Sequence, residues 1–228
     1  MSTRPPSLFD RWTLEQLDAA RRESVPEAGA VASAAGLADA GDIAGAGAAL
    51  AGALERAEDI RLLFLGFQFF FRTGDHARAE AWTLKRLRIA EREGEAVHVA
   101  RACTNLGLIH LATGRVESAR PLMERAVEID ERLGNLEGLA RDLGNLANVH
   151  EALGELETAW TLNERSLEIA TRIGAAEIAA GKRANMGDIA HALGRKEDAR
   201  TLWRNAMDDF ARLGIEKYRR ECEAKLAG

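Results

Sequence analysis

Apolar and small residues in the middle of the chain recur with the spacing of a helix face. From Cys103 to Leu111 they fall at positions i, i+3, i+4, i+7 and i+8, which is one stripe of an amphipathic helix. Gly114 follows this stripe and predicts the helix end, because glycine adopts the left-handed C-cap conformation without a steric penalty. A second stripe begins at Ala119 and stops at Gly134. The pattern therefore predicts a hairpin of two amphipathic helices.

This hairpin pattern repeats every 40 residues. Four consecutive units follow one another without insertion or deletion, at 56–95, 96–135, 136–175 and 176–215. An internal period of this length predicts a solenoid, in which each unit buries its apolar side against its neighbours. The recurring positions are Gly74, Gly114, Gly154 and Gly194; Ala79, Ala119, Ala159 and Ala199; and Gly94, Gly134, Gly174 and Gly214.

Residues 24–55 predict a fifth, divergent unit that is rich in alanine and glycine. The tetrapeptide from Ser24 to Glu27 has the pattern of a capping box, which would begin the first helix of this unit. Small side chains bury little apolar area, so we expect this unit to be the least stable part of the chain.

The two ends of the chain depart from the repeat. Residues 1–23 predict a segment with a short helix that starts near Thr13 and Gln16. Residues 216–228 predict a single helix that caps the last unit and faces its charges outward. Its apolar positions, at i, i+4 and i+8, are Tyr218, Cys222 and Leu226.

The repeat resembles the tetratricopeptide family. The family signature W-x2-L-G-x2-Y…A-x3-F corresponds here to Cys103-x2-Leu106-Gly107-x2-His110…Ala119-x3-Met123. Small residues at Gly107, Ala147 and Gly187 would let each first helix approach its hairpin partner. Residues 56–215 carry the resemblance, with two departures: glycine replaces the closing proline, and the period is 40 residues instead of 34.

The resemblance implies an all-α, right-handed solenoid of antiparallel helical hairpins with a C-terminal capping helix. Longer units of this kind resemble those of bacterial regulatory proteins and of eukaryotic peptide-binding scaffolds. The family's concave groove is lined by the first helix of each unit, with its second and sixth positions in or beside the groove. The residues at those positions, and at the ninth, are Arg61, Arg101 and Arg141; Asn105, Asn145 and Asn185; and Gln68, Asn148 and Asp188.

These groove residues have the chemistry to hold an extended peptide. An asparagine amide donates to a backbone carbonyl and accepts from a backbone N–H, and an arginine holds a carboxylate with two parallel hydrogen bonds. We therefore predict a non-catalytic scaffold that binds an acidic segment or a C-terminal carboxylate of a protein partner. The alternative for the same residues is that they tie each helix to its neighbour.

Five of the seven phenylalanines lie between Phe64 and Phe71, and a single helix cannot turn them all to one side. One interpretation is that they fill the space beside the small-residue unit at 24–55. The other is an apolar patch, either in the groove at Phe71 or as a contact between two chains. A self-assembling adaptor is accordingly a second functional hypothesis, and a sensory module of a bacterial-type regulator is a third.

Composition and charge restrict the partners. Nearly half of the 228 residues are apolar, and the net charge of −5 gives no general attraction to nucleic acid or to an anionic membrane. The N-terminal sequence lacks the apolar stretch of a signal peptide, and two cysteines make no disulfide framework. We expect a cytoplasmic protein with neither a nucleic-acid nor a membrane partner.

Candidate catalytic and metal-binding residues have structural explanations. His110 and His150 occupy the aromatic position of the repeat, a full unit apart, which favours a core role over a shared zinc ion. Cys103 occupies an apolar position, which predicts a buried thiol. No glycine turn carries the lysine–serine/threonine pair of a phosphate-binding loop. We therefore expect no enzyme activity and no cofactor.

Overall fold

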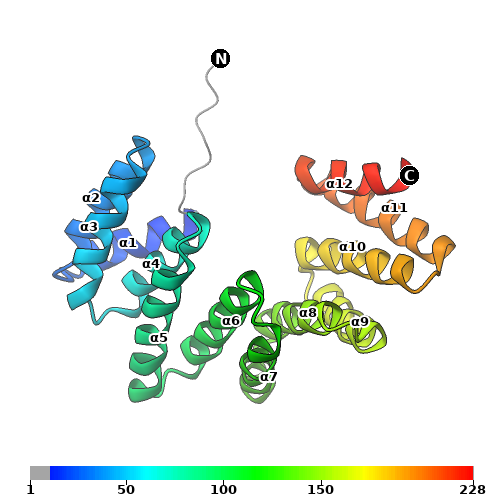
Figure 1. The fold of residues 1–228 in the computed structure, drawn as a ribbon, viewed down its shortest axis with the longest axis horizontal. Coiled ribbons are helices and arrows are strands. Elements are labelled where there is room, and N and C mark those ends of the chain that lie inside the picture. Colours follow the sequence, from blue (N-terminus) through cyan, green and yellow to red (C-terminus); the bar gives the residue numbers. More distant parts are fainter. Residues whose placement is uncertain (1–10, 228) are drawn as a thin grey trace. The chain divides into compact units, whose positions relative to one another are not determined.

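The computed structural model describes residues 11–227, and within this range the chain forms helices and no strand (Figure 1). The all-α prediction is confirmed. The first helices are α1 (Arg11–Arg22), α2 (Ala28–Asp39), α3 (Ile43–Arg56), α4 (Ile60–Arg72), α5 (His76–Glu93) and α6 (Ala96–Ala112). They are followed by α7 (Val116–Leu133), α8 (Leu136–Ala152), α9 (Leu156–Arg172), α10 (Ala176–Ala192), α11 (Lys196–Leu213) and α12 (Glu216–Ala227).

The chain divides into two compact units, Met1–Ile109 and His110–Gly228, which we call the N-terminal unit and the C-terminal unit. In the N-terminal unit α2 packs against α3 and α4 against α5. In the C-terminal unit successive helices from α7 to α12 pack against one another. Each unit is therefore a stack of consecutive helices, as in a solenoid of hairpins.

The glycines of the 40-residue period end the helices as predicted. All eight, from Gly74 to Gly214, have positive φ angles between 63° and 82°. At Gly134, which ends α7, the N–H of Asn135 donates to the carbonyl of Asp130 at 3.0 Å. This pairing satisfies a carbonyl that the last helical turn leaves without a partner, and it needs a left-handed residue between donor and acceptor.

The capping box predicted at Ser24 is wrong. Helix α2 begins at Ala28, with Glu27 at the N-cap and no side-chain cap hydrogen bond. Ser24 instead has a φ angle of 58° and follows the end of α1, where the N–H of Val25 donates to the carbonyl of Ala20 at 3.0 Å. Ser24 thus takes the place that a glycine takes after the later helices. The start of α1, at Arg11, lies two residues before the predicted Thr13.

The phenylalanines of α4 divide between two surroundings. Phe67, Phe69 and Phe70 are buried in the core of the N-terminal unit together with residues of α2 and α3. A Cβ atom added to Gly47 on α3 would lie 3.4 Å from the Phe69 ring, so the small residues of that helix make room for it. Phe71 is half-buried and stacks on Phe67 with ring centroids 5.4 Å apart. The space-filling interpretation therefore holds for Phe69 and Phe70.

Small residues of the first helices do bring hairpin partners together in the C-terminal unit. A Cβ atom on Gly187 of α10 would lie 2.5 Å from the indole of Trp203 on α11. In the preceding hairpin, Ser166 of α9 donates a hydrogen bond to the carbonyl of Ala140 on α8. The close approach predicted for Gly187 is confirmed.

Helix α12 caps the C-terminal unit. Its Cys222 is 2% exposed and packs in a core cluster with Phe210 of α11, while Leu226 packs near Trp203. Tyr218 stays 42% exposed but lies 5.3 Å from the Phe210 ring, centroid to centroid. None of the helices described is both long and apolar enough to span a membrane.

Candidate peptide-binding groove

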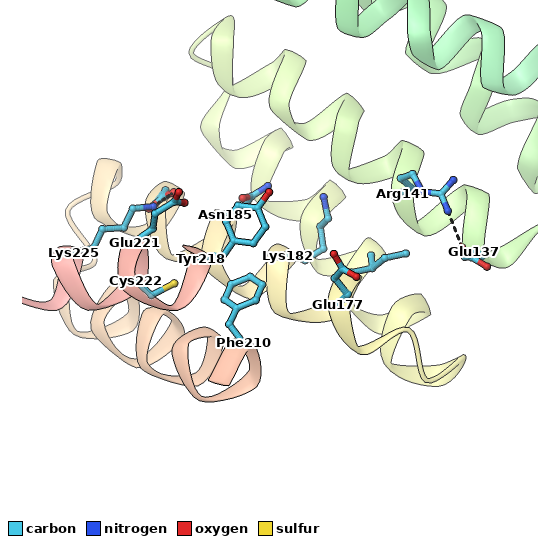
Figure 2. A pocket seen from close by; sticks show the side chains of 14 residues that line it. Glu137, Arg141, Glu177, Lys182, Asn185, Phe210, Tyr218, Glu221, Cys222 and Lys225 are labelled. Atoms are coloured by element: carbon cyan, nitrogen blue, oxygen red, sulfur yellow. Dashed lines mark hydrogen bonds and ion pairs between the residues drawn. The ribbon is translucent and has the colours of Figure 1, made fainter. Parts of the chain in front are cut away.

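A groove of about 700 Å³ lies on the C-terminal unit, lined mainly by α8, α10 and α12 (Figure 2). Helices α8 and α10 are the first helices of their hairpins, which are the elements expected to line a groove, and α12 occupies the equivalent place after α11. The lining residues are Glu137, Arg141, Glu177, Ile178, Gly181, Lys182, Ala184, Asn185, Asp188, Phe210, Tyr218, Glu221, Cys222 and Lys225.

Arg141 stands at the α8 side of the groove. Its Nη2 donates to Glu137 Oε1, one turn earlier on the same helix, at 2.8 Å. The Arg141 side chain is 48% exposed and that of Glu137 is 67% exposed, so water screens this pair. An exposed pair of this kind contributes little to stability, and a ligand carboxylate can replace Glu137 at small cost.

Lys182 places an ammonium group in the groove, and no carboxylate among residues 11–227 forms an ion pair with it. Figure 2 shows its side chain rising from α10, with no hydrogen bond or ion pair drawn to it. The amine packs over Gly144 of α8, where an added Cβ atom would lie 1.9 Å from Nζ. Burial lowers the pKa of Lys182 to about 8, because the helices around it exclude water from the charged form.

Asparagines from successive first helices meet beside this lysine. Asn185 of α10, which lines the groove, donates from Nδ2 to Oδ1 of Asn148 on α8 at 3.3 Å. Asn145, one turn before Asn148, is half-buried. The Asn148–Asn185 bond ties α8 to α10, which is what the alternative interpretation of these residues expects. It leaves the remaining amide donors and acceptors of each side chain for a ligand.

Asp188 joins three helices at the α12 end of the groove. Both of its carboxylate oxygens accept from Lys225 Nζ of α12 at 2.6 Å, and Oδ1 also accepts from Nε1 of Trp203 on α11 at 2.9 Å. Asp188 therefore fixes the position of α12 and is already engaged within the chain.

An apolar surface completes the groove between α10 and α12. Tyr218 and Phe210 present their rings there (Figure 2). Ile178 also lines the groove. Among the described residues, the groove thus combines the unpaired Lys182 amine, the carboxylates of Glu177 and Glu221, amide groups and an apolar wall.

The remaining predicted residues lie in the N-terminal unit. Arg61 is held by carboxylates of its own unit: Nη2 bonds to Asp59 at 2.6 Å and to Glu23 at 2.7 Å. These two acids raise its pKa further above the usual arginine range. Arg101 is exposed on α6, while Gln68 and Asn105 are each 8% exposed. The contacts of Arg61 therefore fit the alternative interpretation, in which these residues hold helices of the chain together instead of binding a peptide.

Sequence reasoning missed Lys182. Groove residues are expected to recur with the period, but the positions equivalent to Lys182 hold Leu62, Ala102 and Asp142. A position that changes from apolar to charged within an otherwise regular repeat is the signal that identifies it. Gly144, whose missing side chain makes room for the lysine, replaces the bulkier Thr104 and Phe64 of the earlier units.

His150 and both cysteines are buried, whereas His110 is half-buried. His150 is 9% exposed, and its Nδ1 bonds to Glu155. Glu155 also accepts from Arg120, and both partners lower the pKa of this carboxyl. Cys103 is fully buried, as its apolar position predicts. No group of three or more metal-ligating side chains occurs among residues 11–227.

The repeat and its helical hairpins have a counterpart among known families. Residues 60–132 and 99–172 each match the family model described as Tetratricopeptide repeat. The chain belongs to the tetratricopeptide repeat family. No curated protein matches its sequence.

Solved structures of tetratricopeptide proteins share the fold at low identity. BtubC (BKLC) from P. vanneervenii is 19% identical, with a TM-score of 0.70 over 94% of this chain and 93% of that one. A STAND protein with a tetratricopeptide repeat sensor from Pyrococcus horikoshii is 13% identical, with a TM-score of 0.74 over 95% of this chain and 34% of that one. A Rap protein complexed with Competence and Sporulation Factor is 15% identical, with a TM-score of 0.56 over 81% of this chain and 58% of that one. These similarities concern the fold alone.

Proposed function

We propose that this tetratricopeptide protein is a non-catalytic scaffold whose groove on the C-terminal unit binds an extended, acidic segment of a partner protein. The observation that carries the proposal is the Lys182 ammonium, which lines the groove without an acceptor or a counter-ion among the described residues. A partly buried cation without a partner is costly, and a ligand carboxylate would reduce that cost.

The surroundings of Lys182 suit a peptide. Arg141 and Asn185 offer further hydrogen bonds to a carboxylate or a peptide group. Neighbouring first helices lie about 8–10 Å apart, a distance that about three residues of extended chain span. The apolar wall of Tyr218 and Phe210 fits an aliphatic or aromatic side chain next to the acidic one. The proposal is supported by the solved structure of a Rap protein of similar fold, which is complexed with Competence and Sporulation Factor.

Selection from a library of random octapeptides tests this proposal. We expect selected peptides to be enriched in aspartate and glutamate, and to bind Lys182→Met about tenfold to a hundredfold more weakly, since a hydrogen bond to a charged group is worth about 1.5–3 kcal/mol. The double variant Arg141→Ala with Asn145→Ala is expected to weaken the same peptides without changing the melting temperature appreciably.

Lys196→Met is the matched control, because it removes the same charge from an exposed position at the start of α11 in the same unit. Its affinity for the peptides is expected to equal that of the wild type. Equal binding by Lys182→Met and wild type, or selection of peptides without acidic residues, contradicts the proposal.

Self-assembly is a second candidate, favoured by the half-buried Phe71 on α4. Its ring extends a stack that also contains Phe67 and Phe64. A dimer through this row predicts a wild-type mass of two chains in light scattering and a mass of one chain for Phe71→Ser. Phe69 is 2% exposed and is not a suitable position for this test, because a polar residue there would disrupt the core. A single-chain mass for the wild type excludes this candidate.

A further inference from the structure

Lys182 differs chemically from the other lysines of the chain. The sequence has five, at positions 85, 182, 196, 217 and 225. Lys225 pairs with Asp188, Lys85 donates to the carbonyls of Leu54 and Glu55, and Lys217 lies over the Tyr218 ring. Lys196 is exposed to solvent. Only Lys182, among these five described side chains, combines partial burial in a groove with an amine that has no acceptor.

We propose that Lys182 is an acylation site of the groove: its amine attacks acyl thioesters, and the resulting amide switches off binding of the acidic partner segment. The switching part of this inference rests on the function proposed above, whereas the reactivity of the amine does not.

The geometry around Lys182 favours a nucleophilic amine. The side chain lies along Gly144, whose lack of a Cβ atom leaves the space that Nζ, Cε and Cδ occupy. The groove gives a small electrophile access to the amine from one side. A lysine desolvated in this way loses its proton more readily and is then a nucleophile at neutral pH.

The charged groups around the groove do not reverse this effect. Helix α8 contributes Glu137 and Arg141, α10 contributes Glu177 and Asp188, and α12 contributes Glu221 and Lys225. Glu137 is paired with Arg141, and Asp188 with Lys225. Helix α9 contributes no charged side chain to the lining, and Asp209 of α11 is paired with Arg183. Burial alone accounts for the lowered pKa of about 8.

The reaction is balanced without an oxidant or a reductant. The neutral amine of Lys182 attacks the carbonyl carbon of the thioester, and a C–N bond forms. The C–S bond breaks, and the sulfur leaves with the bonding electron pair as a thiolate. The proton released by the nitrogen passes to solvent or to that thiolate, so the products are the amide and a free thiol. The amide carries no charge, and the groove loses the cation proposed to hold the partner's carboxylate.

The test uses the full chain and a small acetyl thioester, S-acetyl-N-acetylcysteamine, with mass spectrometry of the five lysines over a series of pH values. At a pH of about 7.5, an amine with a pKa of about 8 is roughly a quarter neutral, against roughly 0.1% at the ordinary value of 10.5. A weaker base is also a weaker nucleophile, so we expect Lys182 to react about tenfold faster than Lys196. Its rate is expected to level off above a pH of about 8.

Two glycine variants show whether the packing causes the reactivity. In Gly144→Ala the new Cβ atom would lie 1.9 Å from Nζ of Lys182, so the amine must move away from α8 into solvent. The pH at which its rate levels off should then rise, and its advantage over Lys196 should fall. Gly52→Ala makes the same change in α3, away from the groove, at a position where the added atom meets nothing within 4 Å, and it should leave the profile unchanged.

The two proposals fail in different ways. Equal rates at Lys182 and Lys196, or an unchanged profile in Gly144→Ala with its circular dichroism intact, overturn the acylation site. The acetylated protein and Lys182→Gln are expected to lose affinity for the selected octapeptides about tenfold or more. Acetylation at Lys182 without any selected peptide contradicts the proposed function alone, and unchanged affinity after acetylation overturns the switch.

Discussion

At the scale of single residues, Arg86 of α5 is a buried arginine that forms no ion pair with a carboxylate in the part of the chain that the structure describes. Its side chain is 2% exposed, with Nε donating to the carbonyl of Ile60 at 3.1 Å and Nη2 bonded to Nδ1 of His98 at 3.2 Å. The guanidinium also lies over the Phe64 ring at 5.1 Å, while Nη1 is buried without a hydrogen-bond partner. Burial lowers the pKa of Arg86 to about 10, with a smaller contribution from Arg101.

Replacing this charge is expected to stabilise the N-terminal unit. The folded-state pKa of Arg86 lies below its ordinary value of 12.5, so folding disfavours the charged form at every pH below about 10. Arg86→Met removes that cost and the unpartnered donor, and we expect it to raise the free energy of unfolding by about 1–3 kcal/mol at neutral pH. Urea denaturation measures the change.

Arg88→Met is the control, since Arg88 is exposed on the same helix. Its effect should stay within about 0.5 kcal/mol. A destabilised Arg86→Met would mean that the bonds to Ile60 and His98 outweigh the cost of burial.

The residues that escaped prediction are those whose role depends on a neighbour far away in the sequence. Lys182 matters because Gly144 lies opposite it on another helix, and no local pattern records that contact. Ser24 was misassigned because serine favours an N-cap locally, whereas α1 extends to Arg22 and needs a left-handed residue to close it. By contrast, the buried positions of Cys103 and His150 followed from the period, because each unit repeats the same packing.

At the scale of helices, α10 carries two glycines that differ in how much space surrounds them. Gly187 faces Trp203, and a Cβ atom there would lie 2.5 Å from both Cδ1 and Nε1 of the indole. Gly181 meets nothing within 4 Å. One helix therefore separates the packing effect of a methyl group from its effect on helix propensity.

Alanine at these two positions is expected to change stability in opposite directions. Gly187→Ala should lower the free energy of unfolding by about 1–3 kcal/mol, because the indole must shift and its bond to Asp188 weakens. Gly181→Ala should raise it by about 0.5–1 kcal/mol, because alanine favours a helix interior over glycine. Thermal unfolding of the two variants checks both signs, and stabilisation by Gly187→Ala would contradict the close approach of α10 and α11.

Helix boundaries were predictable where glycine decides them. A positive φ angle is strained for other residues, so the recurrence of glycine at Gly94, Gly134, Gly174 and Gly214 fixed where the second helices stop. For the groove, only its location could be predicted from the sequence. Which side chains are available in it depends on pairings such as Asp188 with Lys225, and Arg61 with Asp59, that no spacing rule supplies.

At the scale of the whole molecule, the hairpin of α2 and α3 stands out because many of the residues that it buries are small. The buried residues of α2 are mainly alanines, with Val31 as the large exception, and α3 adds Leu50 and Leu54. Larger buried side chains lie elsewhere in both units, at Phe69 and Phe70 of α4 in the N-terminal unit and at Trp203 and Phe210 of α11 in the C-terminal unit.

Amide hydrogen exchange is expected to reflect this difference. Helices α2 and α3 should exchange faster than α8 to α11, because opening them exposes less apolar area and costs less free energy. Mass-spectrometric exchange on peptides from each helix provides the measurement. Slower exchange in α2 and α3 would show that Phe69 and Phe70 stabilise these helices more than their alanines suggest.

The two cysteines provide a built-in reporter of such openings. Cys103 lies in the N-terminal unit and Cys222 in the C-terminal unit, and both are buried thiols that are not part of a disulfide. An alkylating reagent can reach each sulfur only when its own surroundings separate, and burial raises the pKa of Cys222, which slows the reaction further. The alkylation rates of the two cysteines therefore measure how often each unit opens locally. The two rates are independent of each other and need no engineered label.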